Sequence, residues 1–63
     1  MLQVLKKPDP QKFEIRIYAH ERELLVYLTV NKIILEGESL IFYNDEDLLL
    51  ISPSRSTKVS PKI

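Results

Sequence analysis

The sequence predicts a small, mainly β protein, an antiparallel meander or barrel of about four or five strands. Two observations carry this prediction. Phe13, Ile15, Ile17 and Ala19 alternate with polar and charged residues, which is the period-two pattern of a half-buried strand. Further along the chain, short apolar runs rich in β-branched and aromatic residues are separated by turn-forming clusters. A chain of 63 residues is expected to form one domain.

Both ends of the chain differ in composition from its middle. Residues 1–11 are predicted to be a basic N-terminal arm, in which Pro8 and Pro10 favour extended backbone. Residues 12–52 hold the periodic apolar residues and are the single predicted β domain. Residues 53–63 are rich in Ser, Pro, Lys and Arg with almost nothing to bury, which predicts a disordered basic tail.

The formal net charge of zero conceals a segregation of charge along the chain. Residues 1–12 carry three lysines and one aspartate, for +2, and residues 52–63 carry three cations and no acid, for +3. Residues 13–51 carry eight acids against three cations, for −5. Proteins hold a phosphate backbone by neutralising it with Lys and Arg, so this acidic body disfavours nucleic acid except at the tails or at a locally basic rim.

The segment 21–36 fits two secondary structures. As a helix it places Arg22, Thr29, Lys32 and Glu36 on one face and Gly37 at its C-terminal cap, which gives an α+β alternative of β-α-β-β order. The β-branched and aromatic residues between 26 and 34 instead favour β-strands in this segment. The strand interpretation is favoured, and the helix stays open as the alternative.

The segment 39–52 is predicted to be a hairpin. Residues 44–47, Asn-Asp-Glu-Asp, separate two apolar runs at 39–43 and 48–52. Alternation along these runs points Leu40, Phe42, Leu48 and Leu50 toward a core. Gly37 marks a tight turn or a bend just before the hairpin.

The side chains that alternate with this core set are also apolar, which is unusual. An antiparallel sheet with one wet face carries polar residues on that face. A chain this short cannot cover both faces of its own sheet unless it curls into a small barrel, and monomers rarely leave such a patch exposed. We therefore predict a partner or homo-oligomer interface at six residues: Leu25, Tyr27, Ile41, Tyr43, Leu49 and Ile51.

The spacing from Asn31 to Leu50, about a third of the chain, resembles the first motif of the Sm-like family of small β-barrels. The residues that stand at the positions of the motif are Asn31, Leu35, Gly37, Phe42, Asp47, Leu48 and Leu50. Lys32, Tyr43 and Asp47 stand where that family usually has Gly, Asp and Asn, and no second motif follows. The resemblance implies a ring-forming oligomer that binds single-stranded, U-rich RNA, with Tyr43 and Asp47 near the base.

An RNA- or DNA-binding small barrel is therefore the alternative function. Its contacts would be Lys32, Tyr43, Asp47, Arg55 and Lys58. Asp47 weakens this alternative, because a carboxylate only accepts hydrogen bonds and repels phosphate. The favoured function is a non-enzymatic protein-interaction module, either a homo-oligomer or an adaptor or inhibitor.

No residue pattern predicts catalysis, a metal site, a cofactor or a small-molecule substrate. His20 beside Glu21 is a lone histidine in a turn, and residues 44–47 lack the glycine and the other ligands of a calcium loop. Two Ser-Pro pairs, one at Ser52 where the tail begins and one at Ser60 within it, are positions where proline-directed phosphorylation would add negative charge beside basic residues.

The expected location is the cytoplasm, without a membrane association. The sequence has no cysteine, as is common for proteins of reducing compartments. Its longest apolar tract, residues 24–35, contains Asn31 and Lys32 and is far shorter than the roughly 20 residues that span a bilayer.

Overall fold

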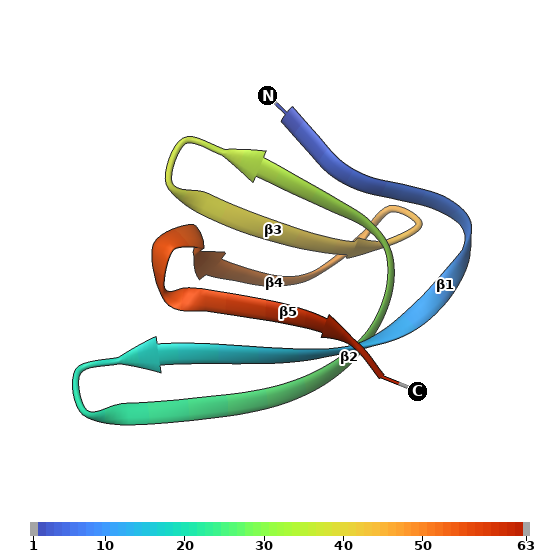
Figure 1. Ribbon diagram of the computed structural model, residues 1–63. Helices are drawn as coiled ribbons and strands as arrows, with labels where there is room; N and C mark the ends of the chain where they lie inside the picture. Colours follow the sequence, from blue (N-terminus) through green and yellow to red (C-terminus); the bar gives the residue numbers. More distant parts are fainter. Residues whose placement is uncertain (1, 63) are drawn as a thin grey trace.

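The computed structural model describes residues 2–62, which form one open antiparallel sheet (Figure 1). Its five strands are β1 (Leu2–Ala19), β2 (Arg22–Glu36), β3 (Ser39–Asn44), β4 (Asp47–Pro53) and β5 (Thr57–Pro61). A 3₁₀ turn, η1 (Ser54–Ser56), joins β4 to β5. The strand order is β4-β3-β2-β1-β5, so the first four strands are a meander and β5 returns to the free side of β1. The predicted mainly β class is confirmed.

The helical alternative for residues 21–36 is wrong, because Arg22–Glu36 is one long strand. Its first part pairs with β1, and its last part pairs with both β1 and β3. Pairing on both sides satisfies the backbone groups there, and the β-branched side chains suit this pleated surface. The tertiary pairing thus agrees with the local propensity.

The sheet curls because β1 and β2 both bend near their middles (Figure 1). The β1–β2 register shifts between Lys6 and Gln11, so that residues 7–10, with both prolines of the predicted arm, have no partner on β2. The bend divides the sheet into two halves, one of β5 with the parts of β1 and β2 next to it and one that contains β3 and β4. It lets the concave sides of these halves meet. The buried cluster consequently spans three strands and joins β1 to β3, which are not neighbours in the sheet: Phe13 and Ile15 of β1, Val30 and Ile33 of β2, and Phe42 of β3.

The predicted tail is not disordered, and this expectation is corrected. Residues 54–56 form η1, and β5 pairs with β1 from Phe13↔Pro61 to Ile17↔Thr57. Val59 packs against the core cluster, while Lys58 and Ser60 stay exposed. An edge strand needs only one or two buried side chains, so its polar composition did not prevent pairing; Pro61 is tolerated at the strand end. The last residue of the tail, 63, lies outside the described range.

The predicted boundaries at 12 and 52 also change, because the sheet extends from residue 2 to residue 61. Residues 2–6 belong to β1 and pair with the end of β2, although most of their side chains are exposed. Residue 1 of the predicted arm is outside the described residues. Within residues 2–62, no helix has the length and apolarity needed to cross a membrane.

The hairpin at 39–52 is confirmed with one correction. Phe42 is fully buried, and Leu40 and Leu50 pack against the core as predicted. Leu48 is instead 52% exposed. Phe42 pairs with Leu50 while Tyr43 pairs with Leu48, so Leu49 is the extra residue of a β-bulge. The bulge shifts the alternation and turns Leu48 to the outer face.

Candidate functional site

The outer side of β3 and β4 forms an apolar surface, which we call the β4 surface: Ile41, Tyr43, Leu48, Leu49 and Ile51. Directly paired residues of antiparallel strands share a face, so Ile41 lies beside Ile51 and Tyr43 beside Leu48. Leu48, Leu49 and Ile51 are 52, 41 and 57% exposed. Because β4 is an edge strand of the described sheet, its outward backbone groups have no strand partner there.

The β4 surface contains four of the six residues predicted for the interface. The other two, Leu25 and Tyr27, lie on the outer face of the β5-β1-β2 half, where they pair with Arg16 and Glu14. Since the two halves pack through their concave sides, their outer faces diverge. The structure therefore divides the predicted interface into two separate surfaces.

We call the outer face of the β5-β1-β2 half the basic face: Lys12, Glu14, Arg16, Tyr18, Glu23, Leu25, Tyr27, Lys58, Ser60 and Lys62. Four cations and two acids give this face a formal charge of +2. Two of those cations come from the former tail, because β5 aligns Lys58 with Arg16 and the Lys62 N–H donates to the Lys12 carbonyl at 2.9 Å. The fold thus converts the acidic body into a locally basic surface.

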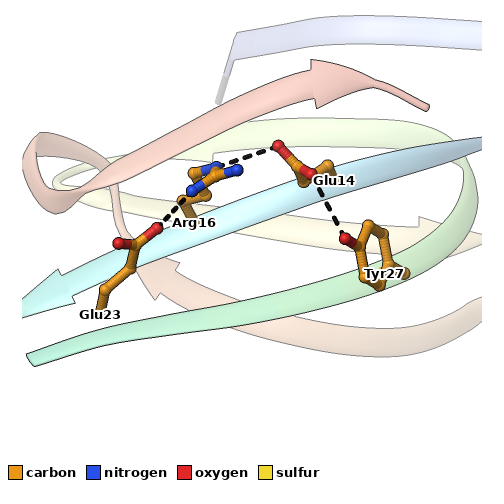
Figure 2. Close-up of polar contacts among 4 residues, drawn as sticks. All are labelled: Glu14, Arg16, Glu23 and Tyr27. Carbon is orange, nitrogen blue, oxygen red and sulfur yellow. Dashed lines mark hydrogen bonds and ion pairs between the residues drawn. The ribbon is translucent and has the colours of Figure 1, made fainter. Parts of the chain in front are cut away.

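Arg16 lies at the centre of the basic face between two carboxylates (Figure 2). Its Nε donates to Glu14 at 3.0 Å, and its Nη1 donates to Glu23 at 2.7 Å. The Tyr27 hydroxyl approaches the other oxygen of Glu14 at 3.4 Å, a long contact. The hydrogen bonds to Glu14 and then Glu23 raise the pKa of Arg16 above its ordinary value.

Each tyrosine of the basic face has a lysine beside its ring. Lys58 Nζ is 5.9 Å from the centre of the Tyr18 ring, and Lys62 Nζ is 5.1 Å from that of Tyr27. Both rings are well exposed, at 40 and 44%. Lys12, Lys58 and Lys62 have no ion pair within the described part of the chain. These contacts place aromatic surface and uncompensated positive charge together.

The residues predicted for nucleic-acid contact do not form one site. Lys32 and Tyr43 do meet, with Nζ 4.6 Å from the ring centre, and Asp47 follows in the same hairpin. Arg55 instead pairs with Glu38 at the opposite end of β3, and Lys58 lies on the basic face. No pattern in the sequence added Tyr18, Tyr27 or Lys62 to the set. The pairing of β5 with β1 brings Lys58 and Lys62 beside these two rings, and the composition of residues 57–61, typical of disorder, hid that strand.

A depression of about 420 Å³ lies between the bend of β1 and the β3–β4 hairpin. Its lining is mixed in charge: Lys6, Lys7, Asn31, Lys32, Asp45 and Glu46. Asn31, only 8% exposed, holds the hairpin here by donating to the Asp45 carboxylate at 2.9 Å and accepting from the Asp45 N–H at 2.8 Å. We call this pair of bonds the Asn31 latch. It supports Asp45 in a left-handed conformation with φ 56°.

The hairpin acids do not converge as metal ligands. Within residues 2–62, no three His, Asp or Glu side chains are grouped as a metal ion would require. His20 lies exposed in the β1–β2 turn. Comparisons of the chain with protein-family models, with curated proteins and with solved structures find no match.

Proposed function

We propose that this chain is a protein-interaction module without chemistry of its own, and that it pairs with a second copy through the β4 surface. One observation carries the proposal: among the strands of residues 2–62, β4 combines a free edge with three large apolar side chains that are 41 to 57% exposed. We further propose the cytoplasm as its compartment, on the basis of a sequence without cysteine.

The contrast between the two edges of the sheet supports this choice. Natural edge strands are usually protected by charged residues, prolines or bulges, since unpaired backbone groups invite another strand. Both edge strands end in a proline, Pro53 and Pro61, but β5 also has a charged residue, Lys58, within its five residues. β4 has its charge at its first residue, Asp47, and is uncharged from Leu48 to Pro53. The bulge at Leu49 restricts regular pairing to the part of β4 that follows it.

A second copy is the occupant that fits best. A two-fold axis next to β4 would pair it antiparallel with itself, and most soluble oligomers have such closed symmetry. The two Ile51 side chains would then approach each other and share one apolar layer with Ile41. A domain of 63 residues has a small core and gains stability by association.

The test uses Ile51→Lys with Leu24→Lys as its matched control. Both positions are large, apolar and 57% exposed, but Leu24 lies near the β1–β2 turn, away from β4. Light scattering should show a dimer for the wild type and for Leu24→Lys, and a monomer of unchanged circular dichroism for Ile51→Lys. Leu49→Lys should behave like Ile51→Lys. A dimer that survives in Ile51→Lys would contradict the proposal.

The basic face supports a second candidate function, binding of single-stranded nucleic acid. Aromatic rings on which bases stack and lysines that contact phosphates are the usual components of such sites. Tyr18 and Tyr27 with Lys58 and Lys62 provide both. The resemblance of residues 31–50 to Sm-like barrels favours the same class of ligand, although the residues it implicates lie on the other half of the sheet.

This candidate has its own measurement, the anisotropy of a labelled oligonucleotide over a salt series. If the three lysines of the basic face each neutralise one phosphate, the logarithm of the binding constant should fall with the logarithm of the salt concentration with a slope of about −2, because each contact to a single strand contributes about −0.7. The variant Lys58→Glu should lose binding, whereas Lys7→Glu, outside the basic face, should lose much less. Equal losses in both variants would refute a site on this face.

A further inference from the structure

The chain contains the dipeptide Ser-Pro twice, and the fold gives the two copies opposite environments. Ser52 is 2% exposed, faces the concave side opposite Leu40, and its hydroxyl is hydrogen-bonded to the Thr57 hydroxyl at 3.0 Å. Ser60 is exposed on the outer face of β5, opposite Glu14. A serine must reach a kinase active site to react, so only one copy is available.

We propose that Ser60 is a phosphorylation site for a proline-directed protein kinase, and that Ser52 is protected by the fold. ATP supplies the phosphoryl group. The Ser60 Oγ forms a bond to the γ-phosphorus, the bond from that phosphorus to the bridging oxygen of ADP breaks, and the hydroxyl proton passes to the kinase base.

The position of β5 makes Ser60 accessible. β5 has only five residues, and within residues 2–62 it pairs with β1 alone and has a free outer edge. Strands with few buried apolar contacts open locally at low free-energy cost. Val59 is the single member of β5 that packs against the core cluster, so an opened strand detaches little apolar surface. The residues around Ser60 can therefore adopt the extended form that a kinase cleft takes up.

The phosphate would arrive at the most highly charged part of the basic face. It would stand opposite Glu14, whose carboxylate holds the Nε of Arg16 (Figure 2). Lys58 and Lys62 lie two residues to either side on the same strand face. A phosphate dianion is a stronger acceptor for guanidinium than a carboxylate, so Arg16 should turn from Glu14 toward it.

This exchange would change the charge of the whole face. A phosphoserine adds about −1.5 to −2 at neutral pH, which cancels the formal +2 of the basic face. If that face binds nucleic acid as proposed above, phosphorylation would release the ligand. Only this consequence depends on the proposed function, because access to Ser60 depends on the fold alone.

The experiment treats the folded full chain with a proline-directed kinase and ATP, and locates phosphate by fragmentation mass spectrometry. One phosphate is expected, on Ser60, and it should be absent from Ser60→Ala and from Pro61→Ala. Ser52→Ala serves as the matched control and should be modified like the wild type. Phosphate on Ser52 of the folded chain, phosphate retained in Ser60→Ala, or no incorporation at all would each overturn the assignment.

A second readout tests the exchange at Arg16. Phosphorus NMR over a pH series should give the phosphoserine a second pKa below its usual value of about 6, because three cations flank it. Arg16→Gln should move that pKa back upward. A pKa at or above the usual value would mean that Glu14 dominates, which would overturn the proposed exchange but leave the mass-spectrometric result intact.

Discussion

Replacing Asn31 by alanine should destabilise the fold by about 2–3 kcal/mol. Asn31 is 8% exposed and makes both bonds of the Asn31 latch, at 2.9 and 2.8 Å. A hydrogen bond to a charged group contributes about 1.5–3 kcal/mol and a neutral one about 0.5–1.5 kcal/mol. Asp45 is exposed, so water replaces part of what it loses, and the lower part of the summed range applies.

The assay is urea unfolding followed by circular dichroism at low protein concentration. A chain of 63 residues is expected to have a total stability of roughly 3–9 kcal/mol. Loss of the latch should therefore shift the midpoint strongly without changing the slope. Asn44→Ala is the control, because Asn44 Oδ1 is buried without a hydrogen-bond partner among the described residues. Removing it should be neutral or slightly stabilising.

The comparison of the two asparagines separates the latch from the composition of the hairpin. Asn44 lies at the hairpin turn, Asn31 contacts that turn from β2, and both lose the same atoms on substitution, but within residues 2–62 only the Asn31 side chain has hydrogen-bond partners. A loss below about 0.5 kcal/mol for Asn31→Ala, the range of ordinary surface substitutions, would show that the latch contributes nothing. Equal losses for both variants would show that hairpin composition matters and the two bonds do not.

Three further changes test other parts of the fold by the same unfolding assay. Phe42→Ala should lower the free energy of unfolding by about 3–5 kcal/mol, because the ring is fully buried at the centre of the core. Cooperative unfolding should then be nearly lost, and a sharp transition in this variant would contradict the placement of Phe42 in the core. Arg16→Gln should cost under about 1 kcal/mol, because both ion pairs are partly exposed. Since the pKa of Arg16 is raised in the folded state, its contribution is present at neutral pH and is lost only as pH rises through that strongly alkaline value, so the cost should be the same at pH values around 5 and 9. Gly37→Ala should cost about 1–2 kcal/mol from its φ of 61° alone, because a Cβ there meets no atom within 4 Å; a much larger loss would reveal a steric clash.

Local pattern was sufficient for those parts of the fold in which neighbours in sequence pair with each other. The hairpin at 39–52 and the strand at 13–19 both follow from alternation bounded by turn residues. Phe42 could be placed in the core for the same reason. The segment 21–36 was ambiguous because its apolar residues satisfy both periods, and only pairing with strands on each side decides between them.

Long-range register decided what the sequence could not. The bulge at Leu49 depends on how β4 aligns with β3, and it reversed the orientation expected for Leu48. The composition of the tail predicted disorder, but residues 57–61 pair with β1 because this pairing buries little besides Val59. The same pairing assembled the basic face from residues more than forty positions apart, such as Arg16 and Lys58.

The predicted interface also shows which features follow from local pattern and which depend on long-range structure. Side-chain alternation predicted that Ile41, Tyr43, Leu49 and Ile51 avoid the main core, and the structure gathers them on the outer side of β3 and β4. Leu25 and Tyr27 obey the same alternation but lie on the basic face. Alternation assigns a face, whereas curvature of the sheet decides whether two parts of that face lie together.

The proposed β4 dimer is tested by the molar mass of the wild-type chain in solution, measured by light scattering over a series of concentrations at low and high salt. An interface built from Leu48, Leu49 and Ile51 excludes water from apolar surface, and salt does not screen that contribution. We expect twice the chain mass of 7.4 kDa, with a dimer that persists at high salt. A monomer at every concentration, or an association that disappears as salt rises, would contradict it.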